Sequence, residues 1–167
     1  MSAMRQEIAQ VMQKYRKLLK PDDKGWRVLE VGIDGDPPPG GNFRRFGTGN
    51  NYETLDILPR VKPTYVADIQ DTKLEAEKFD IIICVQTLEH LYSPKKAIKE
   101  IFKLLKKGGY TILDNPWTYE YHPHYSYPDY WRISPSAMKR MMKEAGFEII
   151  KCKLNKLLVT GLGRKPK

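Results

Sequence analysis

The stretch "FDIIICVQTLEHLYSPKKAIKEIFKLLKKGGYTILD" (residues 79–114) decides the fold. Its opening, "FDIIICV" (79–85), is a continuous and mainly β-branched run, which is typical of a strand covered on both faces. Ser93 and Pro94 follow as the N-cap and first position of a helix, and the apolar stripe of that helix runs over 98–105. The stretch therefore predicts a strand followed by a crossover helix.

The strand pattern continues on both sides of this helix. Gly108 stands where its C-terminal cap is expected, and "YTILD" (110–114) is the next strand. Three more strands are expected earlier in the chain, over 26–31, 52–57 and 64–69. Strands that alternate with crossovers indicate a mostly parallel sheet.

Helices and a hairpin complete the expected architecture. An amphipathic N-terminal helix over 1–21 ends at a proline, and a second helix with a methionine stripe is expected over 134–146. Residues 147–154 and 156–162 predict a C-terminal antiparallel hairpin. We expect one domain over 1–167, an α/β fold with a doubly wound, mostly parallel seven-stranded sheet and helices on both faces.

Composition is that of a globular domain, with 41% hydrophobic and 29% charged residues. The net charge of +9 would suit a polyanionic partner such as nucleic acid, although solvated helix faces also explain it. No stretch approaches a membrane-spanning length. Cys84 and Cys152 have no partner at metal-ligand spacing, so we expect packed thiols and a reducing, cytoplasmic setting.

Acidic residues end the second and third expected strands. Parallel α/β sheets bind ligands beyond the carboxyl ends of their strands. Asp56 follows the glycine turn at Gly32 by 24 positions, near the spacing of about 20 at which a carboxylate meets a ribose hydroxyl. Asp68 ends the following strand. The pattern predicts a nucleoside site at this edge.

The loop after Gly32 does not suit a dinucleotide. Asp34 and Asp36 would repel a pyrophosphate, and the Pro/Gly loop over 36–51 removes the helix N-terminus that would lie beneath it. A nucleoside that lacks phosphate and carries positive charge would suit these carboxylates. S-adenosylmethionine, with its sulfonium and ammonium groups, is such a ligand.

From residue 26 to about 164 the chain resembles the class I S-adenosylmethionine-dependent methyltransferases. The motifs that carry the resemblance are "VLEVG" (28–32), "LDI" (55–57), "ADIQD" (67–71) and, above all, the stretch over 79–113. "DYWRISPSAMKRMMKEAGFE" (129–148) resembles a segment of one subgroup that is often associated with glycan or small-molecule methylation. The departure from the family lies at Asp34 and Asp36, where glycines are usual.

The resemblance implies a set of cofactor-binding residues. Glu30 and Gly32 would lie against the methionine portion of S-adenosylmethionine, with the loop through Asp34 and Gly35 close to the ligand. The remaining contacts would be Asp56 to the ribose, Ile57 to the adenine, Asp68 and Ile69 to the adenine edge, and Val85 and Gln86 to the methionine side.

The acceptor side is expected in an aromatic loop over 115–133. Substrate contacts are expected from Trp117, Tyr130, Trp131 and Arg132. Either His122 or His124 could remove a proton from the acceptor, with Asp129 orienting the imidazole. The alternative is a packed aromatic loop in which the histidines hydrogen-bond only locally, and Arg132 pairs with a neighbouring carboxylate.

No metal is expected, and the ends of the fourth and fifth strands give the reason. Asp114 and Asn115 would supply two oxygen ligands, but Val85 and Gln86 stand where a further aspartate would be needed. "DNPW" (114–117) follows the fifth strand, which disfavours amino methylation of nucleic-acid bases.

These observations predict an S-adenosylmethionine-dependent methyltransferase that acts on an oxygen or nitrogen atom of a small-molecule or glycan acceptor. A chain of this length could dimerise to complete its acceptor site. Two alternatives stay open: a basic nucleic-acid-binding module on the same fold, and a nucleic-acid methyltransferase.

Overall fold

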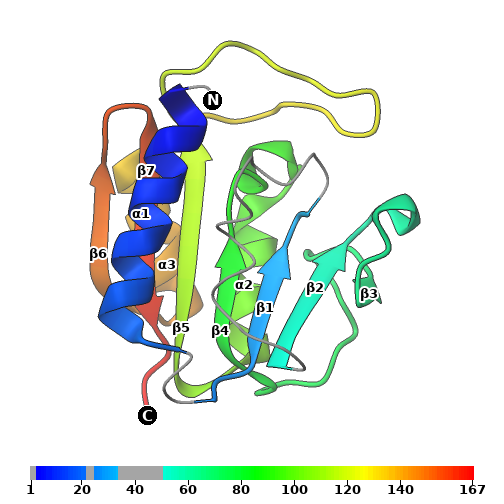
Figure 1. The fold of residues 1–167 in the computed structure, drawn as a ribbon, viewed down its shortest axis with the longest axis vertical. Helices are drawn as coiled ribbons and strands as arrows, with labels where there is room; N and C mark the ends of the chain where they lie inside the picture. Colours follow the sequence, from blue (N-terminus) through cyan, green and yellow to red (C-terminus); the bar gives the residue numbers. More distant parts are fainter. Residues whose placement is uncertain (1–2, 22–24, 34–50) are drawn as a thin grey trace.

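The computed structural model describes residues 3–21, 25–33 and 51–167. Within them lie three α-helices, two 3₁₀ turns and a seven-stranded sheet (Figure 1). The helices are α1 (Ala3–Leu19), α2 (Pro94–Leu104) and α3 (Pro135–Ala145), and the 3₁₀ turns are η4 (Pro59–Val61) and η5 (Leu88–His90). The strands are β1 (Val28–Val31), β2 (Tyr52–Asp56), β3 (Tyr65–Val66), β4 (Phe79–Cys84), β5 (Leu105–Pro116), β6 (Glu148–Leu154) and β7 (Leu158–Arg164).

The strand order is β3-β2-β1-β4-β5-β7-β6. Strands β1 to β5 pair in parallel, whereas β7 pairs antiparallel with both β5 and β6. The chain builds outward from β1 to β3 and then returns to place β4 on the other side of β1. This reversal between β1 and β4 is the point at which doubly wound sheets bind ligands.

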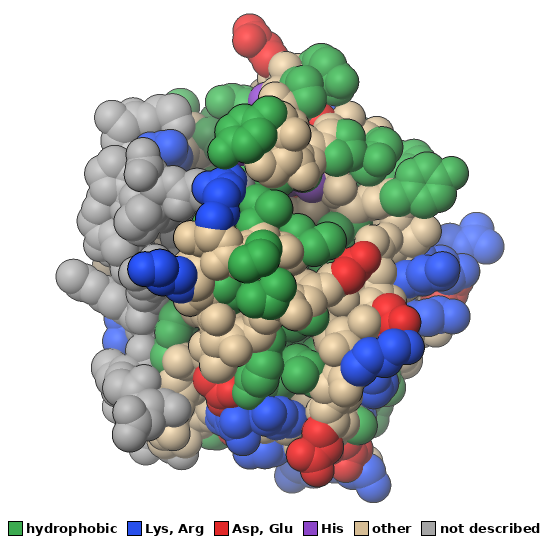
Figure 2. All heavy atoms as spheres, turned by 90° about the vertical axis from the view of Figure 1, so that its right-hand side faces the viewer, with side chains coloured by type: hydrophobic (Ala, Val, Ile, Leu, Met, Phe, Trp, Pro, Cys, Tyr) green, Lys and Arg blue, Asp and Glu red, His purple; other side chains and the backbone are tan. Residues whose placement is uncertain are grey.

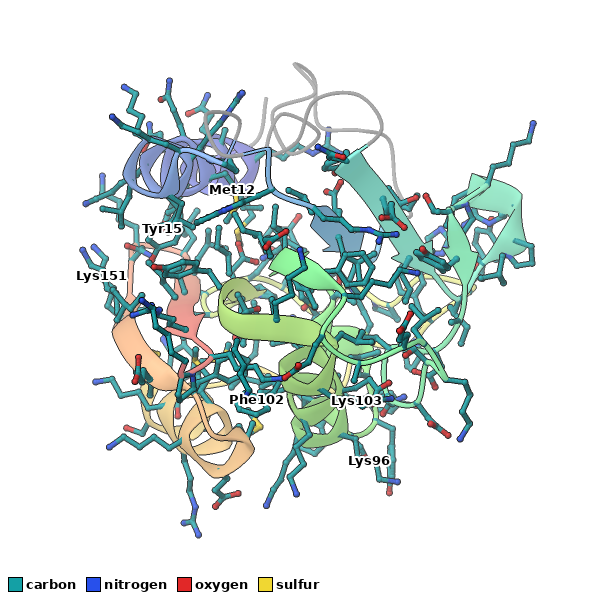
Figure 3. The ribbon with its side chains drawn as sticks, turned by 90° about the horizontal axis from the view of Figure 1, so that it is seen from below. Met12, Tyr15, Lys96, Phe102, Lys103 and Lys151 are labelled. Carbon is teal, nitrogen blue, oxygen red and sulfur yellow. The ribbon has the colours of Figure 1, made fainter. Side chains whose placement is uncertain are left out.

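Two helical layers cover the sheet, with α1 on one face and α2 and α3 on the other (Figure 3). Apart from Asp80, every residue of strand β4 is apolar, because the strand is covered on both faces. Ile81 and Ile83 pack beneath α1 with Met12 and Tyr15, while the alternate residues pack against α2 and α3. The predicted doubly wound, mostly parallel sheet with a C-terminal antiparallel hairpin is confirmed.

The predicted C-terminal cap of α2 was wrong by three residues. The helix ends at Leu104, and Gly108 lies inside β5 instead of capping the helix. Leu105 is extended and wholly buried, because its backbone pairs with the start of β4 at Phe79. Gly108 takes a φ of +77° within the strand, and its N–H donates to the carbonyl of Lys165.

The other helix predicted near the C-terminus has the expected caps. Ser134 accepts a hydrogen bond from the N–H of Ala137, and Gly146 ends α3 with a φ of +106°. Met138 and Met142 are wholly buried against the sheet. None of the described helices is long and apolar enough to span a membrane.

Between β5 and α3 the chain crosses the carboxyl end of the sheet as a long connection (Figure 1). We call residues 117–133 the aromatic loop, because β5 extends to Pro116 and takes up the first two residues of the predicted loop. Figure 2 faces the β3 edge and shows hydrophobic side chains gathered toward this end of the molecule, with most lysines and arginines below and beside them. The exposed apolar side chains include Ile57, Val66 and Tyr125.

Candidate active site

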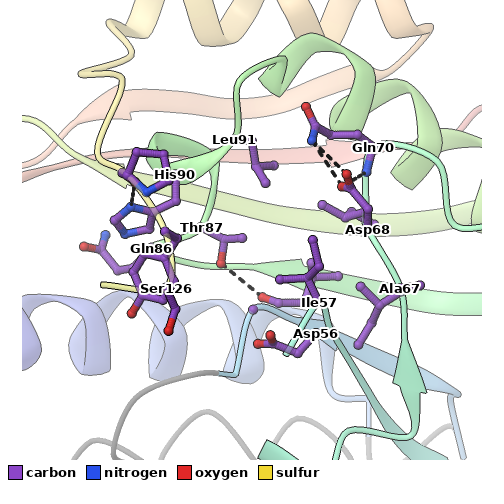
Figure 4. A pocket seen from close by; sticks show the side chains of 16 residues that line it. Asp56, Ile57, Ala67, Asp68, Gln70, Gln86, Thr87, His90, Leu91 and Ser126 are labelled. Carbon is purple, nitrogen blue, oxygen red and sulfur yellow. Dashed lines mark hydrogen bonds between the residues drawn. The ribbon is translucent and has the colours of Figure 1, made fainter. Parts of the chain in front are cut away.

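A pocket lies beyond the carboxyl ends of β1, β2 and β4, at the reversal of strand order (Figure 4). In Figure 4, Asp68, Gln70 and Ala67 lie on one side of the pocket, and Gln86, His90 and Ser126 lie on the other. Six residues expected to hold the cofactor line it: Gly32, Asp56, Ile57, Asp68, Ile69 and Gln86.

The glycine turn after β1 is required sterically. Gly32 has a φ of +75°, and an added Cβ would lie 2.8 Å from Cγ2 of Thr87 and collide with its hydroxyl. The Thr87 hydroxyl donates to the carbonyls of Val31 and Val85, which ties the end of β1 to the end of β4. The backbone of β1 can therefore pass close to a ligand between the two strands.

Asp56 organises the floor of the pocket. One carboxylate oxygen accepts from the N–H of Ile33 and the other from the N–H of Leu58, each at 2.8 Å. These bonds fix the carboxylate at the end of β2, and a carboxylate is a suitable acceptor for hydroxyl donors. Beside it the Ile57 side chain is 58% exposed and offers an apolar surface for a ring.

Asp68 is held by Gln70. Its carboxylate accepts from the Gln70 backbone N–H at 2.8 Å and from the Gln70 amide at 3.1 and 3.2 Å. The Gln70 side-chain carbonyl in turn accepts from the N–H of Ser93, which precedes α2. Gln70 was not among the predicted site residues, although its position directly after "ADI" marks it as a neighbour of the strand end.

Gln86 takes a strained conformation for a non-glycine residue, with a φ of +50°. Asp114 holds it there: the same carboxylate oxygen accepts from the backbone N–H of Gln86 at 3.0 Å and from its amide at 2.9 Å. Burial raises the pKa of Asp114 to about 7. Asp114 therefore positions a pocket residue from within the core.

The other predicted cofactor residues are placed differently. Glu30 and Val85 do not line the pocket, and the Glu30 carboxylate accepts a hydrogen bond from the Tyr52 hydroxyl. Asp34, Gly35 and the predicted Pro/Gly loop up to residue 50 lie outside the described residues. The predicted roles of these residues stay predictions.

The aromatic loop is fastened to η5. The carbonyl of Glu89 accepts from the N–H of Tyr130 at 2.8 Å, and the carbonyl of Leu91 accepts from the Trp131 indole N–H at 2.9 Å. His90 Nδ1 donates to the carbonyl of Pro128 at 2.6 Å. As a result Ser126, Tyr127 and Pro128 form one wall of the pocket, which strand-end reasoning could not have located.

His122 and Asp129 lie in contact, as the sequence-based hypothesis of an oriented histidine requires. Asp129 Oδ2 lies 3.1 Å from His122 Nδ1 and accepts from the His122 backbone N–H at 2.9 Å. Arg132 donates to both Asp129 oxygens, at 2.5 and 2.8 Å, and these bonds lower the pKa of Asp129 to about 2. Arg132 also donates to the carbonyls of Tyr119 and Glu120, so its guanidinium holds the loop together.

The other residues predicted to face the acceptor do not lie together. His124 stacks on Tyr127, and its Nδ1 accepts from the N–H of Ser126 at 3.3 Å. Tyr130 and Trp131 are 46% and 43% exposed, whereas Trp117 packs against the core beneath α2 and α3. Their roles toward an acceptor stay predictions.

Asp114 and Asn115 do not form an open cation site. Both side chains are wholly buried, and Asn115 donates to the carbonyls of Pro116 and Ile133. A different group could hold a metal: Glu89, His90 and His122 bring one ligand atom each to within 4.8 Å of one another. Burial lowers the pKa of His90, which favours the neutral imidazole that metals bind.

Comparison with known proteins agrees with this geometry. The family described as "Methyltransferase domain" matches residues 3–151. A ubiquinone biosynthesis O-methyltransferase from Coxiella burnetii is 26% identical in an alignment 98 residues long, which covers 50% of this chain and 42% of that protein. A 2-methyl-6-phytyl-1,4-hydroquinone methyltransferase from Oryza sativa subsp. japonica is 24% identical over 139 residues, covering 64% of this chain and 39% of the relative.

The chain thus spans about two fifths of the length of these relatives. Among solved structures, the S-adenosylmethionine-dependent methyltransferase from Mesorhizobium loti superposes with a TM-score of 0.68 at 11% identity, over 92% of this chain and 96% of that one. At this identity the superposition shows only the fold, and the assignment to a family rests on the match over residues 3–151. The chain belongs to the class I S-adenosylmethionine-dependent methyltransferase family, whose cofactor is S-adenosylmethionine.

Proposed function

We propose that the protein transfers the methyl group of S-adenosylmethionine to an oxygen atom of a small-molecule acceptor beneath the aromatic loop. One observation carries this proposal. The pocket has aspartates at the ends of β2 and β3 on one side, and His90 with the aromatic loop on the other. A nucleoside at the aspartate side would direct its methionine portion toward the histidine side.

The aspartate side suits adenosine. Asp56 would accept the ribose hydroxyl protons, Ile57 would cover a face of the adenine, and Asp68 would accept from the adenine amino group. Gln86 and Gly32 border the path toward the methionine portion. A positively charged sulfonium fits this end of the sheet, because Asp56 and Asp68 are carboxylates and the described lining residues include no lysine or arginine.

The histidine side suits a hydroxyl acceptor. The acceptor O–H loses its proton, the oxygen attacks the methyl carbon, and the carbon–sulfur bond breaks with its electron pair on sulfur, which gives S-adenosylhomocysteine. Alignment of donor and acceptor supplies most of the rate, about 7–11 kcal/mol in favourable cases. The Coxiella burnetii relative is named for O-methylation, and on this chain the imidazole of His90 lines the pocket on the side where an acceptor would lie.

Transfer of tritium from methyl-labelled S-adenosylmethionine tests the proposal. Matched acceptors would be offered in pairs, such as a catechol and the corresponding aromatic amine, with the product identified by mass spectrometry. We expect label on a hydroxyl compound at a rate at least about tenfold above that of its amine partner, and transfer at least about tenfold slower by Asp56→Ala at a cofactor concentration below saturation. Label on nitrogen or carbon alone would contradict the assignment to oxygen.

A second candidate function has its own observation. Lys14 on α1 and Lys151 and Lys153 on β6 line a groove, and the neighbouring ammonium groups of Lys14 and Lys153 lower the pKa of Lys151. Such crowding attracts an anion, and nucleic acid would be a suitable one at a net charge of +9. RNA binding that weakens steeply with salt and is lost in Lys151→Glu would support this candidate. Equal binding by Lys151→Glu would exclude this groove.

A further inference from the structure

Three side chains with metal-ligating atoms converge at the acceptor side of the pocket. Glu89 and His90 belong to η5, and His122 reaches them from the aromatic loop. One carboxylate oxygen and one nitrogen of each imidazole lie within 4.8 Å of one another. His90 also lines the pocket itself. The group therefore sits between the protein interior and the place where an acceptor would bind.

Glu89 is a buried carboxylate whose two oxygens both lack a hydrogen-bond donor in the described part of the chain. Its side chain is wholly buried, and neither oxygen has a hydrogen-bond partner among the described residues. The guanidinium of Arg132 is engaged by Asp129. A buried carboxylate that accepts no hydrogen bond is stabilised by a cation close to its oxygens.

The hydrogen bonds of both histidines direct a lone pair to Nε2. His90 Nδ1 lies 2.6 Å from the carbonyl of Pro128, which can only accept, so Nδ1 carries the proton. His122 Nδ1 lies 2.9 Å from the carbonyl of Glu120 and 3.1 Å from Asp129 Oδ2, both closer than the Arg132 guanidinium at 3.3 Å. In the neutral state each imidazole then has its lone pair on Nε2.

This arrangement matches the surroundings of metal-ligating histidines, which donate their other N–H to a carbonyl or carboxylate. His90 Nε2 faces Glu89 Oε1 at 3.7 Å. A cation placed between them would need a contraction of the group, since metal–nitrogen and metal–oxygen bonds are about 2.0–2.2 Å long. His122 can supply this movement, because its side chain is 31% exposed and lies on a loop.

We propose that Glu89, His90 and His122 bind a divalent first-row metal ion of the Zn²⁺ class, with a coordination position open toward the acceptor. Two neutral imidazoles and one carboxylate form a ligand set that such ions prefer. This proposal departs from the sequence-based expectation of no metal, which was argued from the ends of β4 and β5, where Asp114 and Asn115 are wholly buried. Glu89 and His90 lie in η5, which follows the end of β4.

The role of the ion rests on the proposed function. An acceptor hydroxyl on the open position would release its proton to water more readily, because the cation stabilises the oxygen anion. That oxygen would then attack the methyl carbon as described above. The ion would replace the general base that the sequence suggested at His122 or His124. Binding of the ion itself does not depend on methyl transfer.

A Co²⁺ titration of the untagged protein, followed by visible absorption, tests the site directly. We expect one Co²⁺ per chain with ligand-field bands, and competition by Zn²⁺. His122→Ala should weaken Co²⁺ binding at least about tenfold, since a ligand is removed. His124→Ala is the matched control and should bind as tightly as wild type, because His124 is held on Tyr127. Absence of the bands, or equal loss in both variants, would overturn the proposal.

Glu89→Gln provides a second variant that keeps the shape of the buried side chain. We expect it to fold and to lose Co²⁺ binding at least about tenfold, because the anionic ligand is gone. Methyl transfer with and without a chelator separates the two proposals. Co²⁺ binding without any methyl transfer would leave the metal site standing and remove the proposed function. Methyl transfer that resists the chelator would overturn the role of the ion.

Discussion

Gly32 and Gly25 have similar backbone conformations but different surroundings, so substitutions at the two positions can be compared. Gly32 has a φ of +75° and faces Thr87, whereas Gly25 has a φ of +61° and no described residue within 4 Å of an added Cβ. Gly25→Ala should cost about 1 kcal/mol, from the left-handed backbone alone. Gly32→Ala should cost at least about 2 kcal/mol more, because Thr87 must also move. Urea unfolding of both variants measures the difference, and equal losses would contradict the close packing of β1 on β4.

Asp114 should make stability depend on pH. Its pKa rises from 3.8 to about 7 in the fold, so between these values the folded protein keeps a proton that the unfolded chain releases. The free energy of unfolding therefore falls as pH rises from about 4 to 7 and levels off above, by up to about 4 kcal/mol. Asp114→Asn keeps an oxygen for Gln86 and removes the titration.

The stability of Asp114→Asn relative to wild type should accordingly rise from pH 4 to pH 7. Denaturant unfolding at several pH values measures it. A difference between the two proteins that is constant over this range would show that Asp114 does not titrate there.

At the level of single residues, the sequence motifs predicted the residues on the aspartate side of the pocket better than those on the histidine side. Asp56, Asp68 and Gly32 stand at strand ends, so strand prediction alone brings them together. Asp114 was assigned no part in the cofactor site, because its hold on Gln86 depends on the parallel register of β4 and β5. His90 and His122 are 32 positions apart, and only the fold of the aromatic loop joins them.

Among the elements, α3 has a sharply divided surface. Met142 is wholly buried, and its sulfur would lie 2.9 Å from a Cβ added at Gly161 of β7, whereas the neighbouring Met141 is only half-buried. Met142→Ala should reduce the free energy of unfolding by about 2–5 kcal/mol, because it leaves a cavity between helix and sheet. Met141→Ala is the matched control and should cost less than half as much. Similar losses in the two variants would contradict the observed helix orientation.

Element types were predictable from periodicity, and element ends were less so. The run 79–85 indicated a strand buried on both faces, and its alternate isoleucines do contact different helical layers. The end of α2 was misplaced because Leu105 fits the apolar stripe of the helix, whereas its backbone pairs with Phe79 in the sheet. Strand β3 is two residues long where six were expected, because Ala67 and Asp68 already turn toward the pocket.

For the whole molecule, the strand order creates the pocket and the long connection after β5 covers it. Both follow from topology, which a single sequence suggests only through its resemblance to a family. Dimerisation, a cytoplasmic location and a nucleic-acid partner stay predictions. The central claim is that the ends of β1, β2 and β4 hold S-adenosylmethionine.

Calorimetric titration with S-adenosylmethionine and S-adenosylhomocysteine tests that claim most directly. We predict micromolar binding by wild type, and affinity about tenfold to a hundredfold lower in Asp56→Ala, since hydrogen bonds to a charged group are lost. Asp71→Ala, an exposed aspartate that pairs with Lys73, should bind as wild type does. No heat with either ligand, or undiminished binding by Asp56→Ala, would contradict the placement of the cofactor in this pocket.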